Sequence, residues 1–408
     1  MDLQDKSVLV IGGGLAGITA SLELAGQGVR VALVEKDDFL GGQAARLACK
    51  ALDTCQKCNG CLAEPRLAAV LSHPGIELWR RSRVEQVVRN GRGFTVRLRQ
   101  EPAYVDPERC NGCGQCLEVC PAAGEGALRA PLIPGDRPRL AISPTSCLYF
   151  KDQRSTLCQD ICPEEAIDFG QTPRQVEIKA DALVLATGFQ PYPAATKERL
   201  GHGRVADVVT ALELEQGLRD HGGPVRPSDG RPPASVAFIQ CVGSRERLGH
   251  NYCSRVCCGY ALRLGRHLRS RHGAQVSIFY MDLQSFGHAL DDFMAAARQE
   301  LNLIRSMPYD VYQGHGGQVV LEYQAVSGQP PVKGRFDLVV LSVGMAPNPD
   351  NPQLAQACGA GLDHHGFLSS RPGVFVAGAA TRPLDMAEVV AQAAGAAQEA
   401  LRYLEECP

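Results

Sequence analysis

The chain has 408 residues, an apolar fraction of 45% and a formal net charge of −2. This length predicts two to three domains, and the near-neutral charge gives no reason to expect a nucleic acid or an anionic membrane as a partner. No apolar run approaches the roughly 20 residues that span a bilayer, and residues 1–6 are too short and too polar for a signal peptide. We therefore expect a cytoplasmic protein, with any membrane association made peripherally through partner subunits.

The first 36 residues carry a dinucleotide-binding pattern. An apolar run precedes the turn Gly-Gly-Gly-Leu-Ala-Gly at 12–17, a helical pattern follows it, and a second strand ends in an acidic residue. The turn glycines allow a tight bend, a close approach of a pyrophosphate to the backbone, and close packing of helix on strand. The acidic residue is placed to accept a hydrogen bond from a ribose hydroxyl. The position of this unit within the chain favours FAD over NAD, and its predicted contacts are Gly12, Gly14, Gly17, Glu35 and Lys36.

Later stretches support FAD as the ligand. A glycine pair closes the first unit, a strand near residue 84 offers backbone to an adenine, and a buried strand ends in Ala-Thr-Gly at 186–188. At the C-terminus, a strand and an Ala-Gly pair precede a helix rich in alanine from 386 to about 404. The further predicted flavin contacts are Gly41, Gly42, Gln43, Val84, Ala186, Thr187, Gly188, Gly378, Asp385 and Met386.

Seventeen cysteines indicate metal binding, because CxxC spacings in a cytosolic chain are more typical of metal sites than of disulfides. Fifteen of them form three groups, and Cys358 and Cys407 lie outside these groups as incidental residues. The segment 104–170 holds the largest group, and it is rich in cysteine and proline with little periodicity. A unit of this size and composition needs a metal or a similar cross-link to be stable.

The cysteines of this segment have ferredoxin spacing, C-x2-C-x2-C-x3-C-P from residue 110. In a ferredoxin pairing, the first cluster takes Cys110, Cys113, Cys116 and Cys162. A second cluster takes Cys120, Cys147 and Cys158, and the expected fourth ligand position holds Ser155. Three alternatives follow for this second site: a [4Fe–4S] cluster with a serine ligand, a [3Fe–4S] cluster, or no cluster. A zinc knuckle is the alternative for the first cluster, and the Cys-Pro pairs argue against it.

Two further cysteine groups lie close to the flavin contacts in sequence. One follows the glycine pair and predicts a [4Fe–4S] cluster, with zinc or redox thiols as alternatives; its members are Cys49, Cys55, Cys58 and Cys61. The other stands where the second α/β unit needs a GxGxxG turn to bind a nicotinamide, and no such turn is present there. We read it as a metal site beside the flavin, with a vicinal disulfide or buried thiols as alternatives; its members are Cys241, Cys253, Cys257 and Cys258.

The stretch IQCVGSRERLGHNYCSRVCCGYAL at 239–262 resembles the A subunit of heterodisulfide reductases. It is also similar to the A subunit of the quinone-interacting oxidoreductase of sulfate reducers and to subunits of class II benzoyl-CoA reductase complexes. The resemblance implies an α/β, thioredoxin-reductase-like flavoprotein with two dinucleotide-binding domains and an inserted ferredoxin-like iron–sulfur domain. It also implies that the third cysteine group ligates a cluster close to FAD. Arg263 stands where electron-bifurcating members have a lysine near the reactive flavin nitrogen, which puts bifurcation in doubt.

The order of motifs predicts the domain boundaries. The segment 201–233 is polar with several glycines and prolines, so we read it as linker and surface. The FAD-binding domain is then expected at 1–103, 171–234 (with the linker) and 346–408, around a ferredoxin-like insert at 104–170 and a NAD(P)-domain-like unit at 235–345.

These patterns predict an oxidoreductase subunit that relays electrons between FAD and three to four [4Fe–4S] clusters. The expected partners are HdrB/HdrC-like or other iron–sulfur subunits, in a complex that we expect to be a homodimer, with flavin-based bifurcation or confurcation as a narrower possibility. One alternative is a self-contained NAD(P)H-dependent disulfide reductase that uses Cys55 and Cys58, and another is a non-catalytic scaffold. We expect His250, His364 and His365 to be surface residues. The terminal electron donor and acceptor are not predicted.

Overall fold

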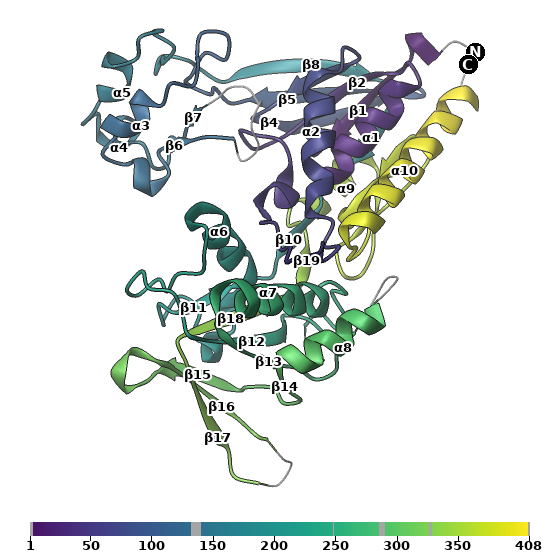
Figure 1. Ribbon diagram of the computed structural model, residues 1–408. Coiled ribbons are helices and arrows are strands. Elements are labelled where there is room, and N and C mark those ends of the chain that lie inside the picture. Colours follow the sequence, from purple (N-terminus) through teal and green to yellow (C-terminus); the bar gives the residue numbers. More distant parts are fainter. Residues whose placement is uncertain (1–2, 132–139, 248, 285–289, 326–328, 407–408) are drawn as a thin grey trace.

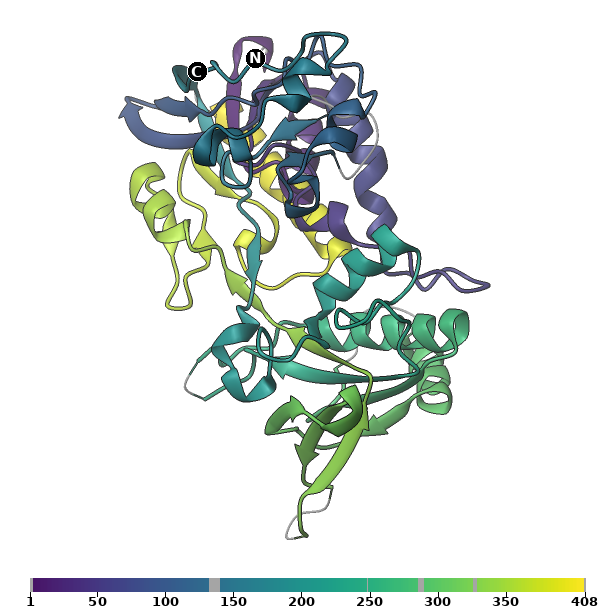
Figure 2. The ribbon, with the colours of Figure 1, turned by 90° about the vertical axis from the view of Figure 1, so that its left-hand side faces the viewer.

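The computed structural model describes residues 3–131, 140–247, 249–284, 290–325 and 329–406. The first and last parts of the chain form one lobe, and the middle part forms a second lobe below it (Figure 1). The short strands β10 (Phe189–Pro191) and β19 (Met345–Pro347) pair in antiparallel fashion where the chain passes between the lobes (Figure 2). Among the described residues, no helix is both long and apolar enough to cross a membrane.

A five-stranded parallel sheet forms the centre of the first domain, in the order β22-β9-β1-β2-β3. Its middle strands are near-continuous apolar runs, as expected for a parallel sheet covered on both faces. The strands are β1 (Ser7–Ile11), β2 (Arg30–Val34), β3 (Ile76–Trp79), β9 (Ala182–Leu185) and β22 (Val374–Val376).

Three helices and a second sheet cover this central sheet (Figure 1). The helices are α1 (Leu15–Gly26), α2 (Ala63–Ser72) and α10 (Met386–Glu406). Helices α1 and α10 approach closely because their buried contacts are largely alanines, which share one core with β1. The antiparallel cover sheet consists of β4 (Ser82–Asn90), β5 (Gly93–Gln100) and β8 (Arg174–Ala180).

The cysteine-rich insert leaves the first domain between β5 and β8. A bridge between Val105 and Ile167 closes its ends, and it has an apolar core of its own. Asp38 of the first domain, whose side chain is only 5% exposed, forms ion pairs with Arg81 and with Arg129 of the insert. The insert contains α3 (Gln115–Val119), α4 (Leu148–Asp152), α5 (Leu157–Asp160), β6 (Leu128–Arg129) and β7 (Ala141–Ile142).

A second parallel sheet, in the order β11-β18-β12-β13-β14, forms the second domain. Its strands are β11 (Val208–Thr210), β12 (Ser235–Val242), β13 (Gln275–Phe279), β14 (Asn302–Ile304) and β18 (Leu338–Val343). Its helices are α6 (Ala211–His221), α7 (Cys257–His272) and α8 (Leu290–Glu300). An antiparallel sheet extends from it, with β15 (Asp310–Gln313), β16 (Val319–Tyr323) and β17 (Val332–Phe336). The chain then returns through α9 (Asn351–Cys358), β20 (Gly361–Leu362) and β21 (Leu368–Ser369).

The prediction that 201–233 is linker and surface is wrong. Strand β11 joins the second sheet beside β18, and α6 packs behind it through Leu214 and Leu218. Helix α6 begins with a capping box, in which the Thr210 side chain accepts from the Glu213 N–H and the Glu213 side chain accepts from the Thr210 N–H. This segment therefore belongs to the second domain.

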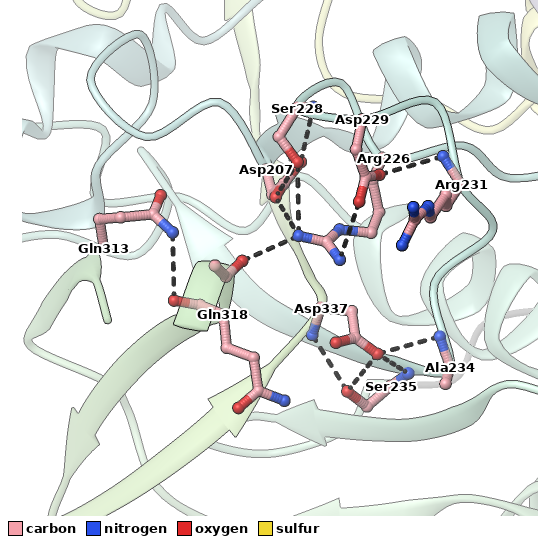
Figure 3. Close-up of polar contacts among 11 residues, drawn as sticks. Asp207, Arg226, Ser228, Asp229, Arg231, Ala234, Ser235, Gln313, Gln318 and Asp337 are labelled. Carbon is pink, nitrogen blue, oxygen red and sulfur yellow. Dashed lines mark hydrogen bonds and ion pairs between the residues drawn. The ribbon is translucent and has the colours of Figure 1, made fainter. Parts of the chain in front are cut away.

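Hydrogen bonds and an ion pair join the turn that follows α6 to Asp207, just before β11 of the second domain (Figure 3). Asp207 is 1% exposed and accepts hydrogen bonds from the Ser228 N–H at 3.0 Å and from the Ser228 hydroxyl at 2.7 Å. Arg226 donates to the same carboxylate at 3.0 Å and to the Gly317 carbonyl at 2.8 Å. These bonds satisfy buried polar groups. They therefore fix the conformation of the glycine- and proline-rich segment after α6.

Candidate flavin and cysteine site

A large cleft of about 1890 Å³ lies between the two domains. The glycine turn, the end of β9 and the start of α10 form one side, and parts of α6, α7 and the end of β18 form the other. Most predicted flavin contacts line it: Gly12, Gly14, Glu35, Lys36, Gly42, Gln43, Val84, Ala186, Thr187, Gly188, Asp385 and Met386. Gly17, Gly41 and Gly378 do not line the cleft, and they contribute to the packing of its wall.

The glycine turn has the shape that a dinucleotide requires. A Cβ atom at Gly12 would lie 2.3 Å from the Ala186 carbonyl oxygen, and one at Gly17 would lie 1.8 Å from the Gly12 carbonyl oxygen. At Gly14, by contrast, a Cβ atom would meet nothing closer than the Gly42 Cα at 4.0 Å. Gly14 is also the N-cap of α1, so the free N–H groups of that helix face the open side of the turn. The residues present therefore fit a bound pyrophosphate.

Glu35 lies at the end of β2 and is 8% exposed. Its carboxylate accepts hydrogen bonds from the Gly13 N–H at 2.7 Å and from the Asp37 N–H at 2.9 Å. Burial raises the pKa of Glu35, and these backbone donors oppose the rise. A buried carboxylate held at the edge of the cleft is suited to accept from a ribose hydroxyl.

The start of α10 connects the flavin side of the cleft to the third cysteine group. Asp385 accepts from the Glu388 N–H at 2.8 Å and donates its own N–H to the Glu388 carboxylate at 2.9 Å, which fixes this helix end. Glu388 also pairs with Arg255 at 2.6 Å. The Arg255 N–H donates to the Cys253 sulfur at 3.3 Å, so one residue contacts both the helix cap and a predicted cluster ligand.

The third cysteine group is assembled at the carboxyl edge of the second sheet. Cys241 lies on β12, Cys253 in the following loop, and Cys257 and Cys258 begin α7. Burial raises the pKa of Cys257, and the thiols of Cys258, Cys241 and Cys253 raise it further. All four are free thiols in the structure, so no vicinal disulfide forms between Cys257 and Cys258.

The loop between β12 and α7 is closed on itself. A Cβ atom at Gly243 would lie 2.0 Å from the Tyr192 ring, so this ring covers the turn. The hydroxyls of Ser244 and Ser254 are 2.6 Å apart, and the Met345 N–H donates to Ser254 at 2.8 Å. The side chains of Tyr192, Ser244 and Ser254 thus fill the space around this turn.

The insert brings its cysteines into two sets. One small cavity is lined by all four predicted ligands of the first cluster, namely Cys110, Cys113, Cys116 and Cys162. Burial raises the pKa of Cys116 to about 11, with further contributions from the other three thiols. Burial likewise raises the pKa of Cys158 to about 11, and Cys120 and Cys147 raise it further, so these three are neighbours. Ser155 is half-buried, and its role as a ligand stays a prediction.

The second cysteine group lies on a loop at the edge of the cleft. Cys58 lines the cleft, while Cys49, Cys55 and Cys61 are exposed. The Lys57 N–H donates to the Cys55 sulfur at 3.3 Å, and Lys57 has a positive φ of 49°. Within the described ranges, no three His, Cys, Asp or Glu side chains form a group that could hold a single metal ion.

A shared backbone feature supports cluster binding at the second and third groups. In each, the residue two positions after a cysteine donates its N–H to the sulfur, and that residue is Lys57 in one and Arg255 in the other. Both have a positive φ, of 49° and 64°, which non-glycine residues rarely adopt. Backbone N–H groups directed at a thiolate stabilise its charge and tune the potential of a cluster. Each loop therefore offers one backbone donor to a predicted cluster ligand.

Arg263 lines the cleft but is engaged with the second cysteine group. Its Nε donates to the Gln56 carbonyl oxygen at 2.8 Å, and its guanidinium lies 5.3 Å from the centre of the Phe293 ring. Burial lowers the pKa of Arg263, while Cys58, Asp385 and Cys55 act in the opposite direction. Its predicted place beside the flavin stays a prediction.

Several site residues were not predicted from the sequence. Lys50 and Glu215 form a buried ion pair at 2.7 Å, and Arg266 donates to the Gln56 side chain at 3.1 Å. The capping box of α6 is a readable helix signal that could have revealed the element that carries Glu215. No sequence pattern predicts the burial of Lys50 or the contact of Arg266 with Gln56. Of the two cysteines taken as incidental, Cys358 is buried, and Cys407 lies outside the described residues.

Comparison with known proteins agrees with this arrangement. A family model of FAD-dependent oxidoreductases matches residues 7–111, and one of 4Fe-4S binding domains matches residues 102–128. Thioredoxin reductase from Lactococcus lactis has a similar fold, with a TM-score of 0.54 at 15% identity over 98% of this chain and 100% of that chain. Thioredoxin reductase from T. acidophilum gives a TM-score of 0.51 at 14% identity over 98% of each chain. The predicted α/β, thioredoxin-reductase-like fold is confirmed.

These findings define an oxidoreductase with a FAD domain and a 4Fe-4S binding domain. Within this class, the chain is similar over nearly its whole length to the A subunits of heterodisulfide reductases, as the sequence resemblance predicts. It is 35% identical to the iron–sulfur A subunit of CoB–CoM heterodisulfide reductase from Methanocaldococcus jannaschii, over 96% of this chain and 63% of that protein. It is 34% identical to the A subunit of ferredoxin:CoB-CoM heterodisulfide reductase from Methanosarcina mazei, over 98% of this chain and 53% of that protein. The chain thus spans less than two thirds of the length of these relatives.

Proposed function

We propose that the chain relays electrons between FAD in the interdomain cleft and [4Fe–4S] clusters held by the three cysteine groups. The observation that carries the proposal is the position of two of these groups at the flavin cleft. Cys58 lines the cleft directly. The third group adjoins it through Arg255, which contacts both Cys253 and the cap of α10.

In this proposal the protein binds and orients the cofactors. FAD, when bound, supplies the exchange between two-electron and one-electron steps. Gly14 and the start of α1 receive the pyrophosphate, and Glu35 accepts from the ribose. The loop around the third group occupies the usual place of a nicotinamide-binding turn, and in it Cys257 and Cys258 are buried while Cys241 and Cys253 are half-buried. Burial and N–H donors at the sulfurs then set the reduction potential of each cluster.

The alternative of a self-contained NAD(P)H-dependent disulfide reductase is disfavoured by the same loop. Tyr192 covers the turn at Gly243, and the hydroxyls of Ser244 and Ser254 lie together behind it. A bound nicotinamide dinucleotide would need this space for its phosphates.

The partners belong to the proposal as well. We infer that electrons pass to or from HdrB/HdrC-like or other iron–sulfur subunits. We further infer that the complex is cytoplasmic and that two copies of it form a homodimer. The named relatives are themselves called subunits, which supports an assembly of this kind. Flavin-based bifurcation is a narrower proposal. The hydrogen bond from Arg263 to the Gln56 carbonyl favours instead electron transfer without bifurcation, because it directs Arg263 to the second cysteine group.

The deciding experiment is the measurement of FAD, iron and acid-labile sulfide per chain in anaerobically purified protein, with EPR during stepwise reduction. We expect about one FAD and roughly 12 to 16 irons, which correspond to three or four clusters. Cys257→Ser should remove about four irons, whereas the matched control Cys358→Ser, at a buried cysteine outside the three groups, should remove none. One FAD with zinc and little iron would refute the relay and favour the thiol reductase.

A further inference from the structure

The loop that carries Cys49 to Cys61 belongs to the first domain, but the second domain holds it in place. Two separate parts of the second domain, α6 and α7, make polar contacts with it. The contacts lie on both sides of Cys49 and between Cys55 and Cys58. The four cysteines themselves are mostly exposed, so they do not fix the loop by their own packing.

The first anchor is a buried ion pair beside Cys49. Lys50 is 1% exposed, and its ammonium group lies 2.7 Å from the Glu215 carboxylate of α6. The same carboxylate accepts from the Ala48 N–H at 2.8 Å, and Lys50 donates to the Ala48 carbonyl at 2.8 Å. Buried ion pairs add little net stability but impose a specific geometry. Glu215 therefore fixes the residues on both sides of Cys49.

The second anchor lies between Cys55 and Cys58. The Gln56 carbonyl accepts from Arg263 at 2.8 Å, and its side-chain oxygen accepts from Arg266 at 3.1 Å. Arg266 is held in turn by two hydrogen bonds of 2.8 Å to Glu300. The two arginines lie three residues apart and so occupy one face of α7.

Helix α7 thus connects two cysteine groups. It begins with Cys257 and Cys258, and it contacts the second group six to nine residues further along. An α-helix rises 1.5 Å per residue and is stiff over this length. The helix therefore sets the spacing between the third group and the Cys49–Cys61 loop.

We propose that Glu215, Arg263 and Arg266 are positioning residues for an iron–sulfur cluster held by Cys49, Cys55, Cys58 and Cys61, so that the second domain keeps this cluster in place beside the flavin cleft. The inference rests on the proposed assignment of a cluster to these four cysteines. It predicts that loss of an anchor loosens this cluster and leaves the FAD site and the other clusters intact.

The test compares release of iron to a chelator from anaerobically purified full-length protein. Arg266→Gln removes the arginine that holds the Gln56 side chain in the second anchor, and Arg269→Gln, at an exposed position of the same helix, is the matched control. Since residues that orient metal ligands typically change metal affinity by about 10- to 100-fold, we expect about four irons to leave at least roughly tenfold faster in Arg266→Gln. The control should match the wild type, and FAD per chain should stay unchanged in both.

A double variant tests the first anchor without leaving a buried charge unpaired. Lys50→Met with Glu215→Leu replaces the ion pair by apolar groups of similar size, a change that is often tolerated. The same acceleration of iron release is expected, together with a changed EPR signal of one cluster. Retained FAD shows that the variant is folded.

Two outcomes would overturn the inference, and Cys58→Ser separates them. If Cys58→Ser leaves the iron content unchanged, the assignment of a cluster to this loop fails and the inference fails with it. If Cys58→Ser removes about four irons but both anchor variants release iron at the wild-type rate, the assignment stands and the positioning role is refuted.

Discussion

Replacement of Gly14 by alanine should separate flavin binding from folding. Gly14 has a φ of −78° and a ψ of −177°, which alanine adopts without strain, and its Cβ would meet no atom closer than 4.0 Å. The new methyl group would instead project into the space where the pyrophosphate approaches α1. A hydrogen bond to a charged group contributes about 1.5–3 kcal/mol, so loss of one weakens FAD binding roughly tenfold to 150-fold.

The matched variant is Gly17→Ala, three residues further along. Its Cβ would lie 1.8 Å from the Gly12 carbonyl oxygen, so the turn must shift, at a cost of about 1–3 kcal/mol or more. We expect the Gly14→Ala apoprotein to unfold within about 2 °C of the wild type and Gly17→Ala to unfold clearly lower. FAD affinity is read from quenching of flavin fluorescence. Gly14→Ala protein that keeps wild-type FAD affinity would refute this placement of the pyrophosphate.

Three further predictions concern the second domain, and urea unfolding of the apoprotein, followed by circular dichroism, checks each. Asp207→Ala leaves Arg226 without its buried partner and should cost about 3 kcal/mol; a cost under about 1 kcal/mol, typical of exposed pairs, would contradict this. Thr210→Ala removes the cap of α6 and should cost about 1 kcal/mol. Burial raises the pKa of Asp337, but hydrogen bonds from Ser235, Gln318 and the Ala234 backbone together outweigh it and hold the pKa below its ordinary range. The contribution of Asp337 to the free energy of unfolding is complete above about pH 4 and is lost as the pH falls through the pKa of Asp337 in the folded protein. In Asp337→Asn, the free energy of unfolding should therefore fall less steeply as the pH is lowered below about 4.

The local patterns predicted the first domain well because its information is short-range. The apolar runs at 8–11 and 182–185 are buried strands, and the turn between Gly12 and Gly17 is followed directly by α1. The ferredoxin spacing likewise places four cysteines around one cavity, because three of them lie on the short segment 110–116.

The sequence failed where the deciding contacts join distant residues. Strand β11 is only three residues long and is defined by its pairing with β18, about 130 residues later, so the polar segment around it resembles a linker. Lys50 looks like a surface lysine until Glu215 of α6 is placed against it. The Gln56 contacts depend on the docking of two domains, which no local pattern encodes.

The insert has a simple relation to the cover sheet. Strands β5 and β8 stay paired without interruption, and the last pair, Gln100 with Arg174, is the point from which the whole insert extends. The insert takes the place of the loop that joins β5 and β8 in an antiparallel hairpin. The entropic cost of closing a loop grows only slowly with the number of residues in it. The insert can therefore be lengthened, shortened or exchanged without a change in the register of β5 and β8. The buried carboxylate of Asp38, which pairs with Arg129 of the insert, is one contact that would have to be kept for an exchanged insert to dock on the first domain in the same way.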